Sequence, residues 1–403
     1  MELFYLCVAL CYDQIVSNMM KFKNTIISAT LCGLAFAVFS CTQSGDKIGY
    51  SNLNPNAQGI EFADFNVVKL SDDVLLGNIY RINVADDLIF VADSEDRLFS
   101  FNMDGSLHAQ YGLKGRAGSE YLYLSAFYID QEADQVCIID NTQGKLLYFE
   151  YDGKFVKADK SEAFNQKTMC YDVYPMPDGK WFVHNRIYND SNVLFLTVDQ
   201  ADGDIQTVRS VLFETPNIAD MCGEHLLSVY DGKISYIAPF DPVIYSYESG
   251  KETKRMEIQG ITKTLSDKDQ SNIKDYDFFK SYNLYNDGYF VGFTGMYETG
   301  SFILFNELTS GNYYIIDKNT GIQKRYEYSC DEELKNLPIM GIKAVYKDWF
   351  VGIQSATLLL GYYAENMPKK SSDPFISKLD NTIKELKEES NPCILFYKIK
   401  TIE

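Results

Sequence analysis

Short apolar runs alternate with turn residues along the chain, and the turns form two interleaved series. In the first series a turn follows an apolar or aromatic run, as Asp104-Gly105 follows residues 97–101. In the second series a turn precedes such a run, as Asp86-Asp87 precedes residues 88–92. Asp-Gly between β-type runs predicts a β-hairpin, because both central residues of its turn adopt positive φ. The other turns are at 152–153, 202–203, 249–250 and 320–321 in the first series, and at 134–135, 178–179, 231–232, 287–288 and 347–348 in the second.

The spacing of the turns predicts a repeated four-stranded unit. Successive turns of the first series lie roughly 50 residues apart, which is typical of a β-propeller blade. The interval from Gly250 to Gly321 is longer, so the fifth unit contains extra chain. The polar stretch 263–280 and a surplus strand at 302–305 are the candidates, and either 289–293 or 302–305 can be the second strand of that unit. The pattern predicts an all-β, six-bladed propeller.

The two ends of the repeat region predict how the ring closes. The sixth unit ends in the apolar run 393–400, which is a third strand with no residues left for a fourth. A strand-like run at 66–70 precedes the first unit and has no partner of its own. Because an open sheet edge favours aggregation, we expect this N-terminal run to be the outer strand of the last blade. The alternative is an unrelated N-terminal arm.

One segment has helical rather than strand periodicity. Ile376, Leu379, Ile383 and Leu386 recur at helical spacing, which predicts a helical insertion near 374–390 on the outside of blade six. A frayed loop is the alternative.

Residues 1–40 are predicted to be a signal region. Two lysines precede the apolar stretch 25–39, which is too short to cross a bilayer and is followed by small residues. The residues before Met19 fit no signal because they include acidic side chains, so we expect translation to start at Met19 or Met20. A short membrane anchor or a buried helix is the alternative.

A lipid anchor is expected at Cys41. Val38, Ser40 and Cys41 are spaced as in a bacterial lipobox, with Cys41 as the acylated residue. Residues 41–59 then form a polar tether, and the propeller covers residues 60–403. Several acyl chains at Cys41 would attach the protein stably to a membrane that it does not span.

Composition excludes some partners and cofactors. The chain has 37 Lys and Arg against 56 Asp and Glu, a net charge of −19, which argues against nucleic acid or an anionic lipid surface as the partner. No metal or other cofactor is expected. The histidines lie in different blades without metal-ligand spacing, and the widely spaced cysteines read as buried thiols. These residues are His108, His184 and His225, and Cys137, Cys170, Cys222, Cys330 and Cys393.

Three segments resemble a known family. Residues 84–105 resemble the opening blade of the six-bladed β-propeller lipoproteins of Gram-negative bacteria, which are similar to NHL- and TolB-type propellers. The glycine-rich segment 112–121 resembles their inter-blade connection, and Asn391-Pro392 ahead of 394–398 resembles their last strand. The resemblance implies the fold and an outer-membrane lipoprotein facing either the periplasm or the cell surface. It implies no particular chemistry.

Two classes of function remain open. The sequence has no nucleophile elbow, and its glycine-rich segment lacks the spacing of a P-loop. This favours a monomeric, non-enzymatic lipoprotein that binds a glycan, a peptide or an envelope protein. The alternative is a metal-dependent lactonase- or lyase-type enzyme, which would need three convergent ligands in the central channel.

The ligand-binding residues are expected in irregular connections, because strands are structural in such folds. The irregular connections are residues 112–121, 263–280 and 296–301. We expect Arg116, Glu120 and Tyr121 at the mouth of a ligand-facing groove. In the competing interpretation, Glu120 and Tyr121 only brace the connection between blades one and two.

Overall fold

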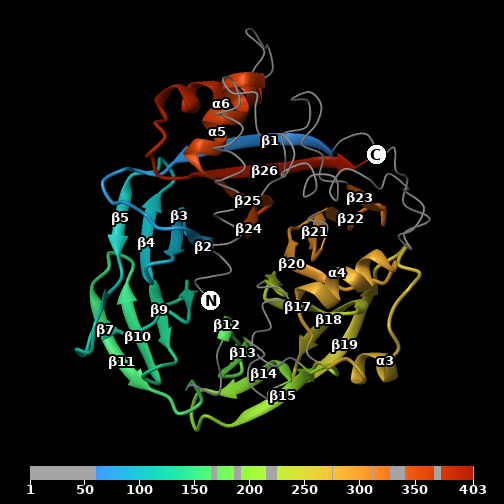
Figure 1. Cartoon of the computed structure of the whole chain (residues 1–403). Coiled ribbons are helices and arrows are strands. Elements are labelled where there is room, and N and C mark those ends of the chain that lie inside the picture. Colours follow the sequence, from blue (N-terminus) through green and yellow to red (C-terminus); the bar gives the residue numbers. More distant parts are fainter. Residues whose placement is uncertain are drawn as a thin grey trace, which may run out of the picture. The chain divides into compact units, whose positions relative to one another are not determined.

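The computed structural model describes residues 60–164, 170–185, 192–214, 225–274, 276–309, 312–326, 341–366 and 374–402. These residues form six antiparallel four-stranded sheets around a common centre (Figure 1). The six-bladed propeller predicted from the turn series is therefore confirmed. The signal region, Cys41 and the tether lie outside the described residues.

Each of the first three blades is a meander of consecutive strands. Blade 1 contains β2 (Ile79–Ala85), β3 (Leu88–Asp93), β4 (Arg97–Asn102) and β5 (Leu107–Gln110). Blade 2 contains β8 (Ala126–Asp130), β9 (Gln135–Asp140), β10 (Lys145–Glu150) and β11 (Phe155–Lys160). Blade 3 contains β12 (Cys170–Pro175), β13 (Lys180–Asn185), β14 (Val193–Asp199) and β15 (Ile205–Ser210).

The last three blades include the insertions and the seam of the ring. Blade 4 contains β16 (Leu227–Tyr230), β17 (Lys233–Ala238), β18 (Asp241–Glu248) and β19 (Lys251–Glu257). Blade 5 contains β20 (Phe293–Glu298), β21 (Phe302–Glu307), β22 (Tyr313–Asp317) and β23 (Gln323–Tyr326). Blade 6 contains β24 (Ile342–Tyr346), β25 (Trp349–Gln354), β26 (Cys393–Ile402) and β1 (Ile60–Lys69).

The N-terminal strand closes the ring, as the sequence predicted. Strand β1 pairs antiparallel with β26, from Ile60 opposite Ile402 to Lys69 opposite Cys393. The two strands lie side by side in Figure 1 although they come from opposite ends of the sequence. Phe65 is buried, and its ring centroid lies 5.4 Å from that of Tyr397 on β26. The outer edge of the third strand of blade 6 is thereby covered.

Blade 5 corrects three sequence expectations. Residues 302–305 belong to β21, the ordinary second strand, so they are not a surplus strand and 289–293 is not the second strand. Asp287 is the C-cap of a helix, not the start of a hairpin turn. The extra chain contains the helices α3 (Asp267–Ser271) and α4 (Phe278–Asn286). The expected irregular segment 296–301 is also shorter than predicted, because β20 extends to Glu298.

The helical insertion of blade 6 has two helices. The one expected near 374–390 is α6 (Pro374–Glu385), which packs on β1 through a bond from Lys378 Nζ to the Phe65 carbonyl at 2.9 Å. A second helix, α5 (Ala356–Asn366), precedes it. Its sequence is apolar on almost every side, so it carries no helical periodicity that could be read in advance. Both helices lie beside β1 and β26 in Figure 1.

The two faces of the ring differ in their connections. The turns between first and second strands form what we call the turn face: Asp86–Asp87, 131–134, 176–179, Asp231–Gly232, 299–301 and Lys347–Asp348. In an antiparallel meander, the connections between second and third strands, and those between blades, leave from the opposite end of the inner strands. This opposite side, the loop face, therefore carries α3 to α6 and every long connection of the described chain.

Aromatic side chains fill the spaces between blades. Phe195 of blade 3 and Tyr236 of blade 4 have ring centroids 4.4 Å apart, and both are fully buried. The buried carboxylate of Glu298 in blade 5 is paired with Arg255 of blade 4 at 2.6 Å. The thiols of Cys137, Cys170 and Cys393 are buried and free, as expected. Cys222 and Cys330 lie outside the described residues.

We predict that Phe65→Ala destabilises the whole ring. Removal of a buried aromatic ring costs about 3–5 kcal/mol, and here it also weakens the seam that covers the edge of β26. Urea denaturation followed by tryptophan fluorescence measures the change. The neighbouring substitution Asn66→Ala, at a half-buried position of the same strand, serves as the control and is expected to cost less than about 1 kcal/mol. Equal losses in the two variants would contradict the prediction.

Candidate functional site

The glycine-rich connection 112–121 is a compact loop with its own hydrogen bonds. It contains a short parallel ladder of β6 (Leu113–Lys114) and β7 (Glu120–Tyr121). The Glu120 carboxylate folds back and accepts a bond from the Ala117 N–H at 2.8 Å. A Cβ at Gly115 would lie 2.0 Å from that carboxylate. Glycine at position 115 therefore leaves room for the folded-back carboxylate of Glu120.

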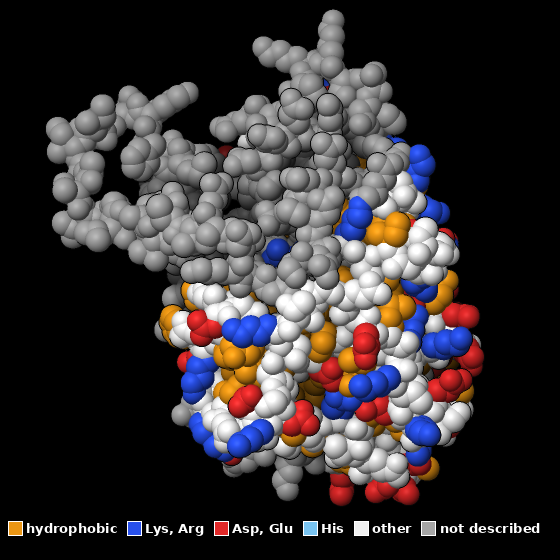
Figure 2. Space-filling model, turned by 90° about the vertical axis from the view of Figure 1, so that its right-hand side faces the viewer, with side chains coloured by type: hydrophobic (Ala, Val, Ile, Leu, Met, Phe, Trp, Pro, Cys, Tyr) orange, Lys and Arg blue, Asp and Glu red, His pale blue; other side chains and the backbone are white. Residues whose placement is uncertain are grey.

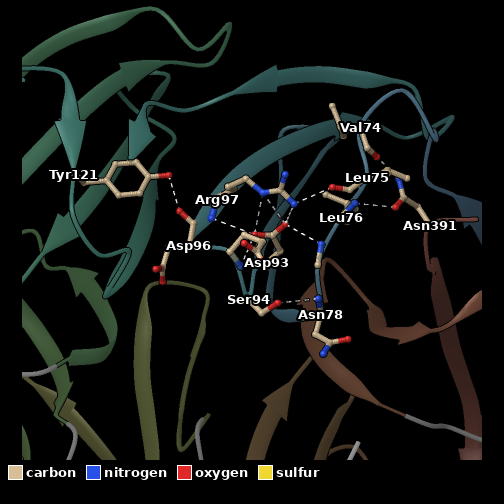
Figure 3. Close-up of polar contacts among 12 residues, drawn as sticks. Val74, Leu75, Leu76, Asn78, Asp93, Ser94, Asp96, Arg97, Tyr121 and Asn391 are labelled. Atoms are coloured by element: carbon tan, nitrogen blue, oxygen red, sulfur yellow. Dashed lines mark hydrogen bonds and ion pairs between the residues drawn. The ribbon is translucent and has the colours of Figure 1, made fainter. Parts of the chain in front are cut away.

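The three candidate residues of this loop lie in different surroundings. Tyr121 is buried between blades 1 and 2, and its hydroxyl donates to the Asp96 carbonyl at 2.9 Å (Figure 3). Arg116 is exposed. Glu120 lines a surface depression of about 290 Å³ together with Leu113 and Phe155. Adjacent residues of a strand point to opposite sides, so Glu120 and Tyr121 do not share one groove wall.

A buried carboxylate beside this loop holds the backbone of blade 1. Asp93 is fully buried and forms an ion pair with Arg97 at 2.5 Å. It also accepts bonds from the N–H groups of Arg97, at 3.1 Å, and of Gly77, at 3.0 Å. In Figure 3 the Arg97 guanidinium lies over Asp93 and reaches the Leu75 carbonyl. The connection from blade 6 to blade 1 is fixed in this way, so we assign Asp93 a structural role.

Asp140 repeats this role in blade 2. It ends the second strand β9, as Asp93 ends β3, and it is fully buried. Its carboxylate accepts a bond from the Leu122 N–H at 2.7 Å and another from the Thr142 N–H at 2.9 Å. Each of these two carboxylates therefore ties an incoming inter-blade connection to its blade. These bonds explain why Asp93 and Asp140 are acidic, although the sequence alone could not distinguish them from ligand-binding residues.

A polar cluster, which we call the channel cluster, lies where the inner strands converge. It consists of Arg81, Asp172, His184 and His225. Arg81 on β2 of blade 1 donates to the Asp172 carboxylate on β12 of blade 3 and to the Tyr171 carbonyl. The Arg81 guanidinium carbon also lies 5.3 Å from the centre of the Phe127 ring of blade 2. The Arg81–Asp172 ion pair therefore links blades 1 and 3 past the inner strand of blade 2.

Both histidines approach Asp172. The His225 Nδ1 lies 3.5 Å from the second oxygen of Asp172. His225 also stacks on the ring of Tyr297 of blade 5, with the ring centroids 4.7 Å apart. A Cβ at Gly295 would lie 2.9 Å from the Tyr297 ring. Glycine at 295 therefore leaves room for the ring that holds His225 in place.

The charges of the cluster are set by burial and by Arg81. Burial alone would raise the pKa of Asp172, but the Arg81 guanidinium and His225 outweigh it and hold this pKa at about 2. Burial lowers the pKa of His184 to about 3, so its ring is neutral at pH 7. Neither ring nitrogen of His184 has a hydrogen-bond partner among the described residues. The channel cluster thus combines the ion pair of Arg81 and Asp172 with the neutral imidazole ring of His184.

This cluster was not predicted from the sequence. The histidines fall in different blades and no contact between them was expected, yet His225 and His184 both lie beside Asp172. The only signal in the sequence was a charged residue at the third position of an inner strand, as in Arg81 of β2 and Asp172 of β12. His108 lies apart, exposed on β5.

No group of three or more His, Cys, Asp or Glu side chains in the described ranges could hold a metal ion. Within the same ranges, no helix is long and apolar enough to span a membrane.

The ring and its channel cluster define the class of this protein as a six-bladed β-propeller. Residues 58–398 match the family described as Domain of unknown function (DUF4934). This match covers most of the chain, and the chain therefore belongs to that family. None of the curated proteins matches the chain.

Solved structures of other proteins are similar to this chain. A putative exported protein from Bacteroides fragilis is 22% identical, with 86% of this chain and 97% of that chain covered and a TM-score of 0.66. A member of the DUF4221 family from Bacteroides vulgatus is 10% identical, with 86% and 100% covered and a TM-score of 0.48. Virginiamycin B lyase from Staphylococcus aureus is 15% identical, with 72% and 82% covered and a TM-score of 0.40.

We predict that His184 makes the protein sensitive to mild acid. The folded-state pKa of His184, about 3, lies below the ordinary histidine pKa of 6.5, so the unfolded chain binds more protons between these values. Stability is therefore complete above pH 6.5 and falls as the pH is lowered towards 3, by up to roughly 4 kcal/mol. Thermal melting between pH 7 and 4 measures this loss.

The variant His184→Phe keeps a ring beside Tyr171 and Phe195 but cannot be protonated. Its melting temperature is expected to depend less on pH than that of the wild type. His108→Phe, at an exposed position, is the control and should keep the wild-type pH profile. If His184→Phe also keeps that profile, burial of the neutral ring is not the cause.

Proposed function

We propose that this chain is an exported cell-envelope lipoprotein whose propeller binds a ligand or partner at its loop face without converting it. The observation that carries the proposal is the difference between the two faces. Short turns close the turn face, whereas the long connections, the helices and the entrance nearest the channel cluster belong to the loop face. Connections on a rigid scaffold are where binding residues concentrate.

The electrostatics of the channel cluster support binding rather than catalysis. Asp172 is compensated by Arg81, so its low pKa makes it a poor general base at neutral pH. His184 is neutral and enclosed. Such paired groups can orient the polar atoms of a glycan, a peptide or an envelope protein. They offer no activated nucleophile for a reaction.

The glycine-rich connection 112–121 is part of the same proposal. Arg116 is exposed and Glu120 lines the adjacent depression, so both can contact a partner that covers blades 1 and 2. Tyr121 then acts as a support, because its buried ring and its bond to the Asp96 carbonyl hold the loop. The side of the molecule that carries α4 has Lys and Arg interspersed with Asp and Glu (Figure 2). A mixed surface of this kind does not favour nucleic acid.

Export and lipidation are inferred from the sequence motif and the fold. The similar protein from Bacteroides fragilis is described as exported, and the lipobox-like residues before Cys41 point to the same compartment. A lipid at Cys41 followed by a polar tether would hold the ring at a membrane as a monomer. Both the periplasmic side and the cell surface are compatible with this attachment.

Cys41→Ser is expected to release the protein from membranes. The substitution removes the thiol that would carry the lipid, so most of the protein should move from the membrane fraction to the soluble fraction after cell lysis. Incorporation of an alkyne-labelled fatty acid should be lost at the same time. Cys32→Ser, in the apolar stretch of the signal region, is the control and should remain labelled. A labelled Cys41→Ser protein would contradict the lipid anchor.

A photo-reactive side chain can locate the binding face in cells. Placed at Arg116 or at the exposed Phe279 of α4, it is expected to give a discrete cross-linked product. Placed at Asp178 or Asp231 on the turn face, it should give none at comparable expression. Cross-linking from the turn-face positions alone would reverse the assignment of the faces.

A further inference from the structure

A cavity of about 310 Å³ opens on the turn face, where blades 6, 1 and 2 meet. The apolar part of its lining, which we call the floor, consists of Val84, Ala85 and Val345, at the ends of the inner strands β2 and β24. This volume is at the small end of the range for ligand sites. It lies at the opposite end of the inner strands from the loop face, so it is separate from the binding face proposed above.

The wall of the cavity is polar and is organised across the three blades. Gln131 of blade 2 donates to the Asp86 carboxylate at 3.0 Å, and the Tyr151 hydroxyl donates to its other oxygen at 2.7 Å. On the other side, the Tyr346 hydroxyl of blade 6 donates to Asp87. The cavity wall is therefore held in place before any ligand arrives.

Lys347 completes the wall on the blade 6 side. Its Nζ lies 3.6 Å from an oxygen of Asp87, and it lies 4.4 Å from the centre of the Tyr346 ring. Both charged side chains remain well exposed, Lys347 at 68% and Asp87 at 74%. They can therefore bond to a ligand in addition to each other.

The backbone of the turn brings the Asp87 side chain to the cavity. Asp87 adopts a left-handed conformation with φ of 61°. The equivalent second position of the turn in blade 4 is Gly232, with φ of 68°. Glycine adopts this conformation without the steric cost that a Cβ adds. Blade 1 therefore has a carboxylate at a left-handed position where blade 4 has glycine, and this position lines the cavity.

The chemistry of the lining selects a class of ligand. The carboxylates of Asp86 and Asp87 offer acceptors, whereas Lys347 and the Gln131 amide offer donors. A ligand without polar groups would leave charges without partners, and an anion would face two carboxylates. A simple amine would face Lys347. Hydroxyl groups both donate and accept, and the carbon-bound face of a sugar ring suits the apolar floor.

We propose that this cavity is a binding site for a neutral sugar, distinct from the loop face. Asp86 and Asp87 accept bonds from the sugar hydroxyls, Lys347 and Gln131 donate to them, and the floor packs against the ring. The site needs the closed ring, because the seam of β1 with β26 completes blade 6, whose strand β24 packs beside β2 of blade 1.

Binding can be tested with the full mature chain by saturation-transfer NMR and calorimetry. The probes are glucose, galactose, mannose, N-acetylglucosamine and cellobiose, with spermidine and citrate as cationic and anionic comparisons. At least one neutral sugar is expected to bind saturably. Asp87→Asn should weaken that binding about tenfold or more, because it removes a charged acceptor. The proposal is overturned if no sugar binds or if only spermidine or citrate binds.

Two further variants separate this site from a purely structural turn. Asp231→Asn removes the same charge from the corresponding turn of blade 4 and is expected to change sugar binding by less than about twofold. Asp87→Gly should abolish sugar binding while leaving the melting temperature unchanged or higher. A lower melting temperature for Asp87→Gly, or equal effects of Asp87→Asn and Asp231→Asn on binding, would overturn the proposal. Neither result depends on what the loop face binds.

Discussion

The pairing of β1 with β26 is the interaction on which the rest of the ring depends. Without it, the third strand of blade 6 would present an open edge, and blade 6 would lose its packing against the insertion helix α6. An open edge exposes unpaired backbone groups and invites association with other chains. Closure instead brings the six inner strands to one centre. Arg81, Asp172 and His225 can meet only because three different blades are held at fixed positions around that centre.

Buried carboxylates then fix the blades relative to their connections. Asp93 and Asp140 each end a second strand and accept backbone N–H groups from the connection that enters the blade. These bonds give the buried carboxylate oxygens hydrogen-bond partners, which a buried polar group needs. The acidic composition of the chain therefore has more than one cause. Some acidic residues hold the backbone, some occupy the turns, and Asp172 balances a buried guanidinium.

The sequence was sufficient for the number of blades and for the closure, because turn residues and an unpaired strand follow from local backbone geometry. It misled in blade 5, where Asp287-Gly288 ends a helix and has the same residues as a hairpin turn. It could not find the channel cluster, since no spacing along the chain links His184 to His225. It placed Arg116, Glu120 and Tyr121 together because they are neighbours in sequence. Because side chains alternate along β7, Glu120 and Tyr121 point to opposite sides of the strand.

The seam has a consequence for how the chain acquires its structure. The strand that starts the propeller can find its partner only after β26 has been synthesised, so blade 6 is completed after the other five blades. Pairing between segments so distant in sequence carries a high entropic cost and is intrinsically slow. Until β26 is present, β1 has no partner strand and the ring stays open. The order of the strands thus makes ring closure a test that both ends of the propeller are present in one chain.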